Sequence, residues 1–264
     1  MSTVAAPAVA PPVVEVRTRG QMFWDEVKSS FTIGFGQLTI MSAFSARWGL
    51  FGAGVGFAVG QILVGWLPKW FHGGHGNPDV TLAKAVRGSI FIGETVARWL
   101  GQILGWSIVV FAGVWWYWYK SWSTGFGVVK PEPGMPVWAQ IIVPAILLFL
   151  FTTLAVLVTE HLGYERLSIR MRPKASPLQK AGFVMLGIVL GVFVYFGAAF
   201  GTGINGMREF VPSVATLFLW PHAPVQFYWW SLLGGRLGSL AAGLVGQVYY
   251  HPVTYQEPVT APIV

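Results

Sequence analysis

The stretch at residues 71–87, FHGGHGNPDVTLAKAVR, constrains this chain most, because it follows an apolar run at residues 48–67 that is long enough to cross a bilayer. Asn77 is a preferred helix cap and Pro78 pre-sets the backbone for a first helical turn, so a helix is expected to begin there. That helix is too short to span, and non-helical backbone at membrane depth persists only where protein buries it or where it lines a watery cavity. The stretch therefore predicts a re-entrant half-helix beside a pore.

A second stretch, GTGINGMREFVPSVATLFL at residues 201–219, repeats this pattern. It follows another apolar run, Asn205 comes after glycines, and a short helix is expected behind it. Asn77 and Asn205 lie about half the chain length apart. Two half-helices in matching positions of two halves are typical of an inverted repeat whose site lies near the bilayer midplane.

The composition favours a membrane protein. Of the 264 residues, 54% are hydrophobic and only 10% are charged, which is too apolar for a soluble domain and typical of a polytopic membrane protein. The chain has no cysteine, which excludes disulfides and thiolate metal sites. His72 and His75 lack a carboxylate set that would complete a metal site, and no catalytic constellation is present. We therefore expect no metal, no cofactor and no enzyme activity.

The apolar runs predict six transmembrane helices in addition to the two half-helices, and thus an all-α membrane protein. Their expected positions are residues 26–44, 48–67, 96–119, 138–158, 181–200 and 227–250. The predicted organisation is a flexible N-terminal tail at 1–22, a transmembrane domain at 23–250 and a C-terminal tail at 251–264. The transmembrane domain consists of two repeats, at about 23–120 and 137–250.

The basic residues, which give the chain a formal net charge of +7, indicate its orientation rather than a nucleic-acid partner. Most of them flank the first span or fill the second-to-third and fourth-to-fifth connections: Arg17, Arg19, Lys28, Lys69, Lys84, Arg87, Arg98, Arg166, Arg170, Arg172, Lys174 and Lys180. The opposite side has Arg47, Lys120 and Lys130. The positive-inside bias predicts a multi-pass protein of the lipid bilayer with both termini in the cytoplasm.

Four short motifs follow one another along the chain. They are Glu26 with Ser30-Phe31 and Gly36; HGGHGNPDVT at residues 72–81; Gln102 with Gly105; and NGMREFVP at residues 205–212. In order, spacing and half-chain position they resemble the aquaporin, or major intrinsic protein, family, of which this chain looks like a divergent member. The resemblance covers about residues 24–250, and it implies structural roles for Glu26, His75 and Gln102.

The resemblance also assigns the residues of a pore. In that family two asparagine side chains donate hydrogen bonds to permeant molecules at the pore centre, where two half-helix dipoles repel cations. By position this centre falls on Asn77, Pro78, Asp79, Asn205, Gly206 and Met207. An outer constriction, the selectivity filter, falls by position on Phe57, Phe193, Thr202 and Arg208. Phe193 stands where water-selective members commonly carry a histidine, which implies a filter of reduced polarity.

Four residues depart from the family pattern. Asp79 replaces the alanine of the family motif, and Gly206 and Met207 replace its second proline and alanine. Arg236 lies in a span that is normally apolar in the family. Asp79 is either a favourable carboxylate at a helix N-terminus or a pore-centre charge or tether. Met207 is long enough to fill the junction of the half-helices, so a blocked pore and a reshaped open pore both fit the sequence. Arg236 is expected to offset Asp79 or Glu26, or to bind a lipid or a partner protein.

The leading hypothesis is a passive channel for water or small uncharged solutes, working as a homotetramer as the resemblance implies. The alternative is a non-conducting or weakly conducting subunit of the same fold, which serves as a structural or assembly partner in a larger membrane complex. Asp79, Met207 and Arg236 favour this alternative. A third hypothesis, a cation channel that uses Asp79, is opposed by the positive charge of Arg208.

Overall fold

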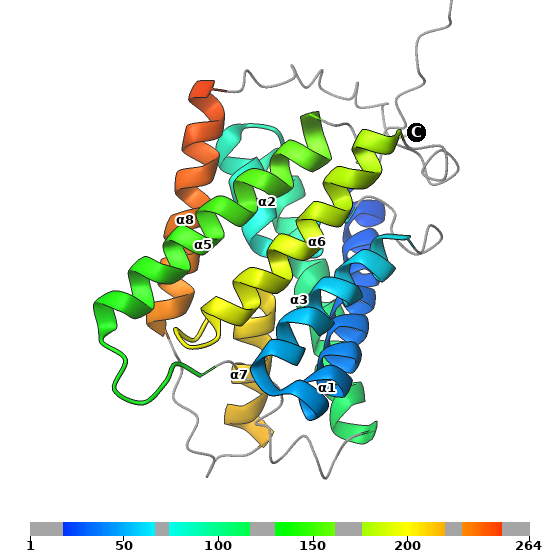
Figure 1. Cartoon of the computed structure of the whole chain (residues 1–264). Helices are drawn as coiled ribbons and strands as arrows, with labels where there is room; N and C mark the ends of the chain where they lie inside the picture. Colours follow the sequence, from blue (N-terminus) through cyan, green and yellow to red (C-terminus); the bar gives the residue numbers. More distant parts are fainter. Residues whose placement is uncertain (1–17, 67–73, 117–129, 162–175, 220–228, 250–264) are drawn as a thin grey trace, which may run out of the picture.

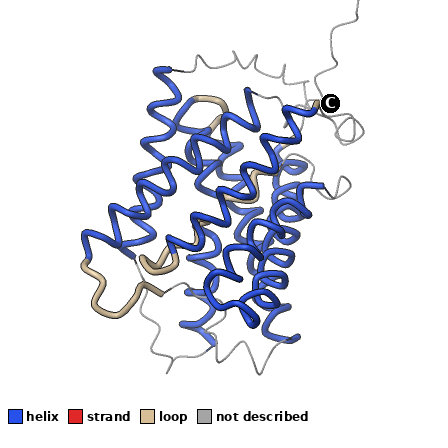
Figure 2. The backbone as a smooth tube through the Cα atoms, viewed as in Figure 1, coloured by secondary structure: helices blue, strands red, loops and turns tan. Residues whose placement is uncertain are grey.

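The computed structural model describes residues 18–66, 74–116, 130–161, 176–219 and 229–249 (Figure 1). Within these ranges every regular element is a helix (Figure 2). The elements are α1 Arg19–Trp66, α2 Pro78–Arg87, α3 Ile92–Trp116, α5 Val137–Val156, the π-helix η2 Leu157–His161, α6 Pro177–Gly197, α7 Gly206–Leu219 and α8 Trp229–Tyr249. The expected all-α fold is therefore confirmed.

The first two expected spans, 26–44 and 48–67, correspond to the two helical arms of one element, α1, which ends at Trp66. Its helical geometry breaks at Trp48 (φ −128°, ψ 15°) and Gly49 (φ 60°, ψ −140°). A positive φ of this kind is accessible to glycine at little cost, so the chain reverses between the two helical arms without a loop. The element begins at Arg19, four residues before the start expected for the transmembrane domain. Most of both predicted tails lies outside the described residues.

The two predicted half-helices are present as α2 and α7, which have 10 and 14 residues. At a rise of 1.5 Å per residue they are about 15 and 21 Å long, well short of the roughly 30 Å hydrocarbon core of a bilayer. Neither can span a membrane, whereas α3, α5, α6, α8 and each arm of α1 supply the long helices of the bundle.

Helix packing follows a two-fold pattern. In the first half α1 packs against α3, and in the second half α5 packs against α8; α1 and α6 join the two halves. Each half-helix packs against the last long helix of the opposite half, since α2 contacts α8 and α7 contacts α3. This reciprocal packing of the two halves agrees with the expected inverted repeat.

Polarity is distributed in the manner of a protein surrounded by lipid. Buried positions hold Glu26, Arg98 and Gln102, whereas large apolar side chains such as Ile146 and Leu237 are exposed. By length and hydropathy alone, two stretches of the described helices qualify as spans, Val137–Glu160 and Lys180–Gly197, with mean hydropathies of 2.8 and 1.9. The sequence predicted six spans, and in α1, α3 and α8 buried polar side chains such as Glu26, Arg98 and Ser239 lower the mean hydropathy.

Close backbone contact joins α5 to α8. A Cβ atom added at Gly238 would collide with the carbonyl group of Ala145, and one at Gly234 would collide with the carbonyl oxygen of Ile141. Small residues at such positions let helix backbones approach, which is how helices commonly associate in membranes.

Substitution of Gly238 by alanine is therefore expected to destabilise the bundle by about 1–3 kcal/mol, the usual cost of overpacking. The melting temperature of the detergent-solubilised protein measures this effect. Gly20→Ala is the matched control, because a Cβ at Gly20 would meet only the hydroxyl of Thr18 at 3.9 Å. Equal melting temperatures for the two variants would contradict the close packing of α5 on α8.

Candidate functional site: the junction of the half-helices

Asn77 caps the start of α2 and also reaches across to the other half of the chain. Its backbone is extended (φ −144°, ψ 120°), and its Oδ1 accepts a hydrogen bond from the N–H of Asp79 at 2.9 Å. Its Nδ2 donates to the carbonyl oxygen of Ile204 at 2.9 Å. The cap of the first half-helix is thus tied to the residue just before the second one.

Asn205 makes the reciprocal set of bonds. Its Oδ1 accepts from the N–H of Met207 at 3.0 Å, and its Nδ2 donates to the carbonyl oxygen of Gly76 at 3.1 Å. The positive N-terminal ends of α2 and α7 therefore meet at one point. An amide nitrogen carries two N–H groups, so each asparagine keeps one donor beyond its cross-chain bond.

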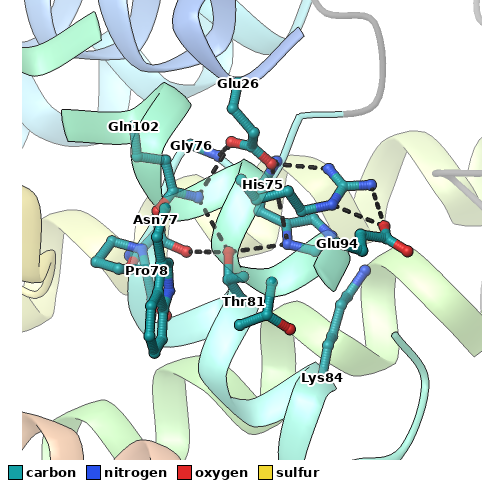
Figure 3. Close-up of polar contacts among 12 residues, drawn as sticks. Glu26, His75, Gly76, Asn77, Pro78, Thr81, Lys84, Glu94 and Gln102 are labelled. Carbon is teal, nitrogen blue, oxygen red and sulfur yellow. Dashed lines mark hydrogen bonds and ion pairs between the residues drawn. The ribbon is translucent and has the colours of Figure 1, made fainter. Parts of the chain in front are cut away.

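Glu26 holds the loop that leads into α2. Its Oε1 accepts from the N–H of His75 at 2.6 Å and its Oε2 from the N–H of Gly76 at 2.9 Å. Arg98 Nη1 lies 2.7 Å from Oε1, and Gln102 Nε2 donates to Oε2 at 3.1 Å. Figure 3 shows Glu26, His75 and Gln102 turned toward one another at the start of α2. The carboxylate is fully buried and fixes the position of the cap.

Thr81 links this network to the first turn of α2. Its hydroxyl donates to the carbonyl oxygen of Asn77 at 3.1 Å, accepts from Gln102 Nε2 at 3.0 Å, and lies 2.9 Å from Nδ1 of His75 (Figure 3). The sequence did not predict a role at the site for Arg98 or for its second partner Glu94, whose carboxylate lies 2.7 Å from the guanidinium. Their signal was an acid and a base four residues apart within an apolar span.

The far end of α2 is anchored by a second carboxylate, Glu160 of η2. Arg87 Nη1 lies 2.5 Å from Glu160 Oε2, Lys84 Nζ lies 3.7 Å from Oε1, and the hydroxyl of Ser89 lies 3.3 Å from Oε2. Basic side chains in the last turn also interact favourably with the negative end of the helix dipole. Both ends of this half-helix are therefore held by buried charge pairs.

The second half of the chain uses a different carboxylate for the corresponding loop. Gln140 of α5 donates to the carbonyl oxygen of Met135, just before the start of that helix, at 2.8 Å. Glu209 of α7 instead accepts from the N–H of Gly203 at 2.7 Å and from the hydroxyl of Thr202 at 2.6 Å. This role was not predicted from the sequence, because the acid lies on the half-helix itself rather than on a span.

Two of the four expected filter residues, Arg208 and Phe57, are in direct contact. The guanidinium of Arg208 lies over the ring of Phe57, with Cζ 4.3 Å from the ring centroid, and Nη1 donates to the carbonyl oxygen of Gly203 at 3.3 Å. Phe193 packs against the buried cluster that contains Phe57. The hydroxyl of Thr202, another expected filter residue, donates to Glu209. That proton is therefore not available to bind a solute in the filter.

Asp79 and Arg236 form the ion pair that the sequence analysis proposed as one of its alternatives. Asp79 Oδ1 pairs with the Arg236 guanidinium and accepts from the hydroxyl of Ser239 at 2.9 Å. Its Oδ2 accepts from the N–H of Gly206 at 3.0 Å. The carboxylate is fully buried and bridges α2, α7 and α8.

A profile built from a known protein family agrees with this architecture. The profile described as major intrinsic protein matches residues 26–246. The chain belongs to the major intrinsic protein family. Members of that family are integral membrane channels that passively conduct water or small uncharged solutes, and they are not enzymes.

The sequence identity of the chain to individual relatives is low. It is 26% identical to Aquaporin TIP1-1 of Arabidopsis thaliana over 85% of this chain and 81% of that protein. It is 25% identical to Probable aquaporin TIP1-1 of Oryza sativa subsp. japonica over 79% of this chain and 75% of that protein. The fold is similar to the X-ray structure of the aquaglyceroporin from Plasmodium falciparum, with a TM-score of 0.60 and 18% identity over 89% of this chain and 98% of that one.

Met207 of this major intrinsic protein lies on a different face of α7 from the one expected. It packs in a buried cluster with Trp106 and Val110 of α3 and with Val211 and Ala215 of its own helix. The spacing of 207, 211 and 215 puts these side chains on one stripe of α7 that faces α3. The structure therefore gives no support to a methionine that fills the junction of the half-helices.

Among the described residues, no group of three or more histidine, aspartate or glutamate side chains could hold a metal ion. The acids of the site pair with arginines or with backbone N–H groups instead. What the junction offers chemically is a set of oriented hydrogen-bond donors and compensated charges.

Proposed function

We propose that Asn77 and Asn205 form the centre of a pore through which this channel passes water and small uncharged solutes. The observation that supports this most is the reciprocal pair of cross-chain amide bonds, Asn77 to Ile204 and Asn205 to Gly76. These bonds fix both amides, and each keeps one N–H that can donate to a molecule in transit. Oriented N–H donors at a narrow point of a pore can replace hydrogen bonds that a neutral solute makes with water, so the free energy of desolvating the solute is low.

The convergence of α2 and α7 supports a barrier to cations at the same point. The N-terminal end of each helix carries about half a positive charge, and both ends meet at the asparagines. A neutral molecule loses little energy there, whereas a cation is repelled. Passive conduction of uncharged solutes follows from this geometry.

The pair of Arg208 and Phe57, with Phe193 packed beside it, forms the outer constriction of the proposed pore. The guanidinium supplies hydrogen-bond donors and charge on one side, and the two rings supply apolar walls. A solute with hydroxyl groups along one edge and a carbon backbone along the other suits such a lining. We therefore propose glycerol-like solutes as well as water.

The assembly and orientation of this channel follow from family and charge. Family members are typically tetrameric, and we propose a homotetramer of this chain. The basic residues gathered in the second-to-third and fourth-to-fifth connections support cytoplasmic termini. Lys84 and Arg87 are paired with Glu160 at the end of α2, and the other connection, at 162–175, lies outside the described residues.

Stopped-flow light scattering of proteoliposomes tests the proposed function. We expect vesicles that carry the purified protein to shrink in a sucrose gradient clearly faster than empty vesicles of the same lipid, and to reswell in glycerol. Met207→Ala is a matched variant that should leave the rate unchanged, because Met207 packs against α3. Shrinkage no faster than that of empty vesicles would refute the proposal and favour a structural subunit of a larger complex.

Phe193→His is expected to lower glycerol permeability relative to water permeability. The imidazole replaces an apolar wall by a polar one opposite Arg208, so the carbon edge of glycerol loses its favourable surface while water gains a hydrogen-bond partner. The ratio of glycerol to water permeability in the same vesicles measures the change. An unaltered ratio would mean that Phe193 does not line the constriction.

A further inference from the structure

Three departures from the family pattern, Asp79, Gly206 and Arg236, meet at one point of the structure. Asp79 lies in the first turn of α2, Gly206 is the first residue of α7, and Arg236 lies in α8. Asp79 accepts from the N–H of Gly206 and pairs with Arg236. Residues from three helices therefore form a single linked unit beside the pore centre.

Arg236 explains why residue 206 is a glycine. Gly206 does not have a positive φ, so its backbone does not require glycine. A Cβ atom added there would collide with the guanidinium group of Arg236, at Cζ and at both terminal nitrogens. The guanidinium thus occupies the space in which any larger side chain, including a proline ring, would lie. The N–H that bonds to Asp79 is a second group that proline would lack.

The charge of Asp79 acts against the positive ends of both half-helices. The carboxylate lies within the first turn of α2 and accepts from the first N–H of α7, so alone it would offset the positive ends that exclude cations. Arg236 places a positive charge against the same carboxylate. Glu209 interacts electrostatically with both of them and with Arg208. At the junction the negative charge of Asp79 and the positive charge of Arg236 therefore compensate each other.

We propose that Arg236 is a charge-selectivity residue of the channel, which neutralises Asp79 so that the pore centre still excludes cations. Because Gly206 has no side chain, it leaves room for the guanidinium of Arg236. This inference rests on the proposed conduction of uncharged solutes and adds the means by which this chain keeps that conduction free of ions. Arg236 acts through Asp79 and is a positioning residue rather than a contact of the permeating molecule.

The first test measures cation leak in proteoliposomes loaded with a potassium gradient. We expect Arg236→Leu to raise potassium flux about tenfold, roughly the effect of one unit charge at about 10 Å with an effective dielectric constant near 20. Arg236→Lys keeps the charge and should stay as tight as wild type. The double variant Asp79→Ala with Arg236→Leu removes both charges and should also be tight. Equal flux in wild type and Arg236→Leu would overturn the proposal.

The second test isolates the contact between Gly206 and Arg236. Gly206→Ala is expected to lower the melting temperature by about 3 °C or more in the wild-type background, because its Cβ collides with the guanidinium. The same substitution in the Asp79→Ala, Arg236→Leu background should leave the melting temperature unchanged. An equal loss in both backgrounds would show that glycine is needed for another reason and would refute the proposed unit.

These outcomes separate the inference from the function on which it rests. A wild-type protein that does not accelerate vesicle shrinkage refutes the proposed conduction, whatever the thermal measurements show. A wild-type protein that does conduct water, together with an Arg236→Leu variant that stays impermeable to potassium, refutes the role of Arg236 alone. Water permeability should stay near wild type in Arg236→Leu, because Arg236 does not contact the permeating molecule. This measurement also serves as a control for folding, since a collapsed bundle would lose water flux.

Discussion

Replacement of Glu26 by leucine is expected to cost about 3–5 kcal/mol of folding free energy, the usual effect of removing one partner of a buried ion pair. The carboxylate holds the N–H groups of His75 and Gly76 and contacts Arg98 and Gln102. Leucine would leave both N–H groups without their acceptor in the interior. We expect the melting temperature in detergent to fall by at least about 6 °C, with loss of the monodisperse peak in size-exclusion chromatography.

Glu94→Gln is the matched control for this substitution. Glu94 contacts Arg98 as Glu26 does, but none of its described bonds holds the loop before α2. Its loss leaves Arg98 paired with Glu26, so we expect a clearly smaller fall in the melting temperature. Similar losses for the two variants would mean that Arg98 pairing matters more than the loop. Glu26→Gln should lie between them, because an amide offers one oxygen where the carboxylate offers two acceptors.

The start of each half-helix could be predicted because its signal is local. A cap such as Asn77 and a first-turn proline such as Pro78 act on the backbone within a few residues, and the structure has α2 beginning at Pro78. The predicted fold class follows from these starts together with the long apolar runs. The sequence also predicted two spans here, 26–44 and 48–67, but not that they would be joined by a break at Trp48 and Gly49 alone, without a separate loop.

The contacts of the site were harder to predict because they depend on which way each side chain points. The sequence left Arg236 with two candidate acids, and the structure pairs it with Asp79 while Glu26 is held by Arg98. Met207 was expected at the junction, yet its place on the stripe of α7 that faces α3 follows only once the two halves are packed. The role of Glu209 was not predicted, because this acid lies on the half-helix itself rather than on a span.

The two halves of this channel hold equivalent loops by unequal means. Glu26 reaches from α1 to the N–H groups of His75 and Gly76, whereas Glu209 reaches back from the first turn of its own half-helix to the N–H of Gly203. A local acid needs no precise placement of a neighbouring span. In the second half, Gln140 of α5 bonds near the start of its own helix, to the carbonyl oxygen of Met135.

Replacement of Arg208 by alanine is expected to have the largest effect on selectivity. The guanidinium lies over Phe57 and is the positive charge of the proposed outer constriction. A unit charge at about 4 Å repels a cation by about 4 kcal/mol with an effective dielectric constant of 20, which corresponds to up to about three orders of magnitude in flux. The lost side chain also widens the opening. We therefore expect both potassium leak and urea permeability to rise in proteoliposomes.

Arg208→Lys separates charge from shape at this constriction. Lysine keeps the positive charge but lacks the planar group that lies on the ring of Phe57. We expect cations to stay excluded while the permeability ratio of urea to water changes. This pattern differs from that of Arg236→Leu, which should admit cations without altering the size of solute that passes. If Arg208→Ala leaves both leak and urea permeability at wild-type values, the pair of Arg208 and Phe57 is not the constriction, and selectivity must arise at the asparagine pair alone.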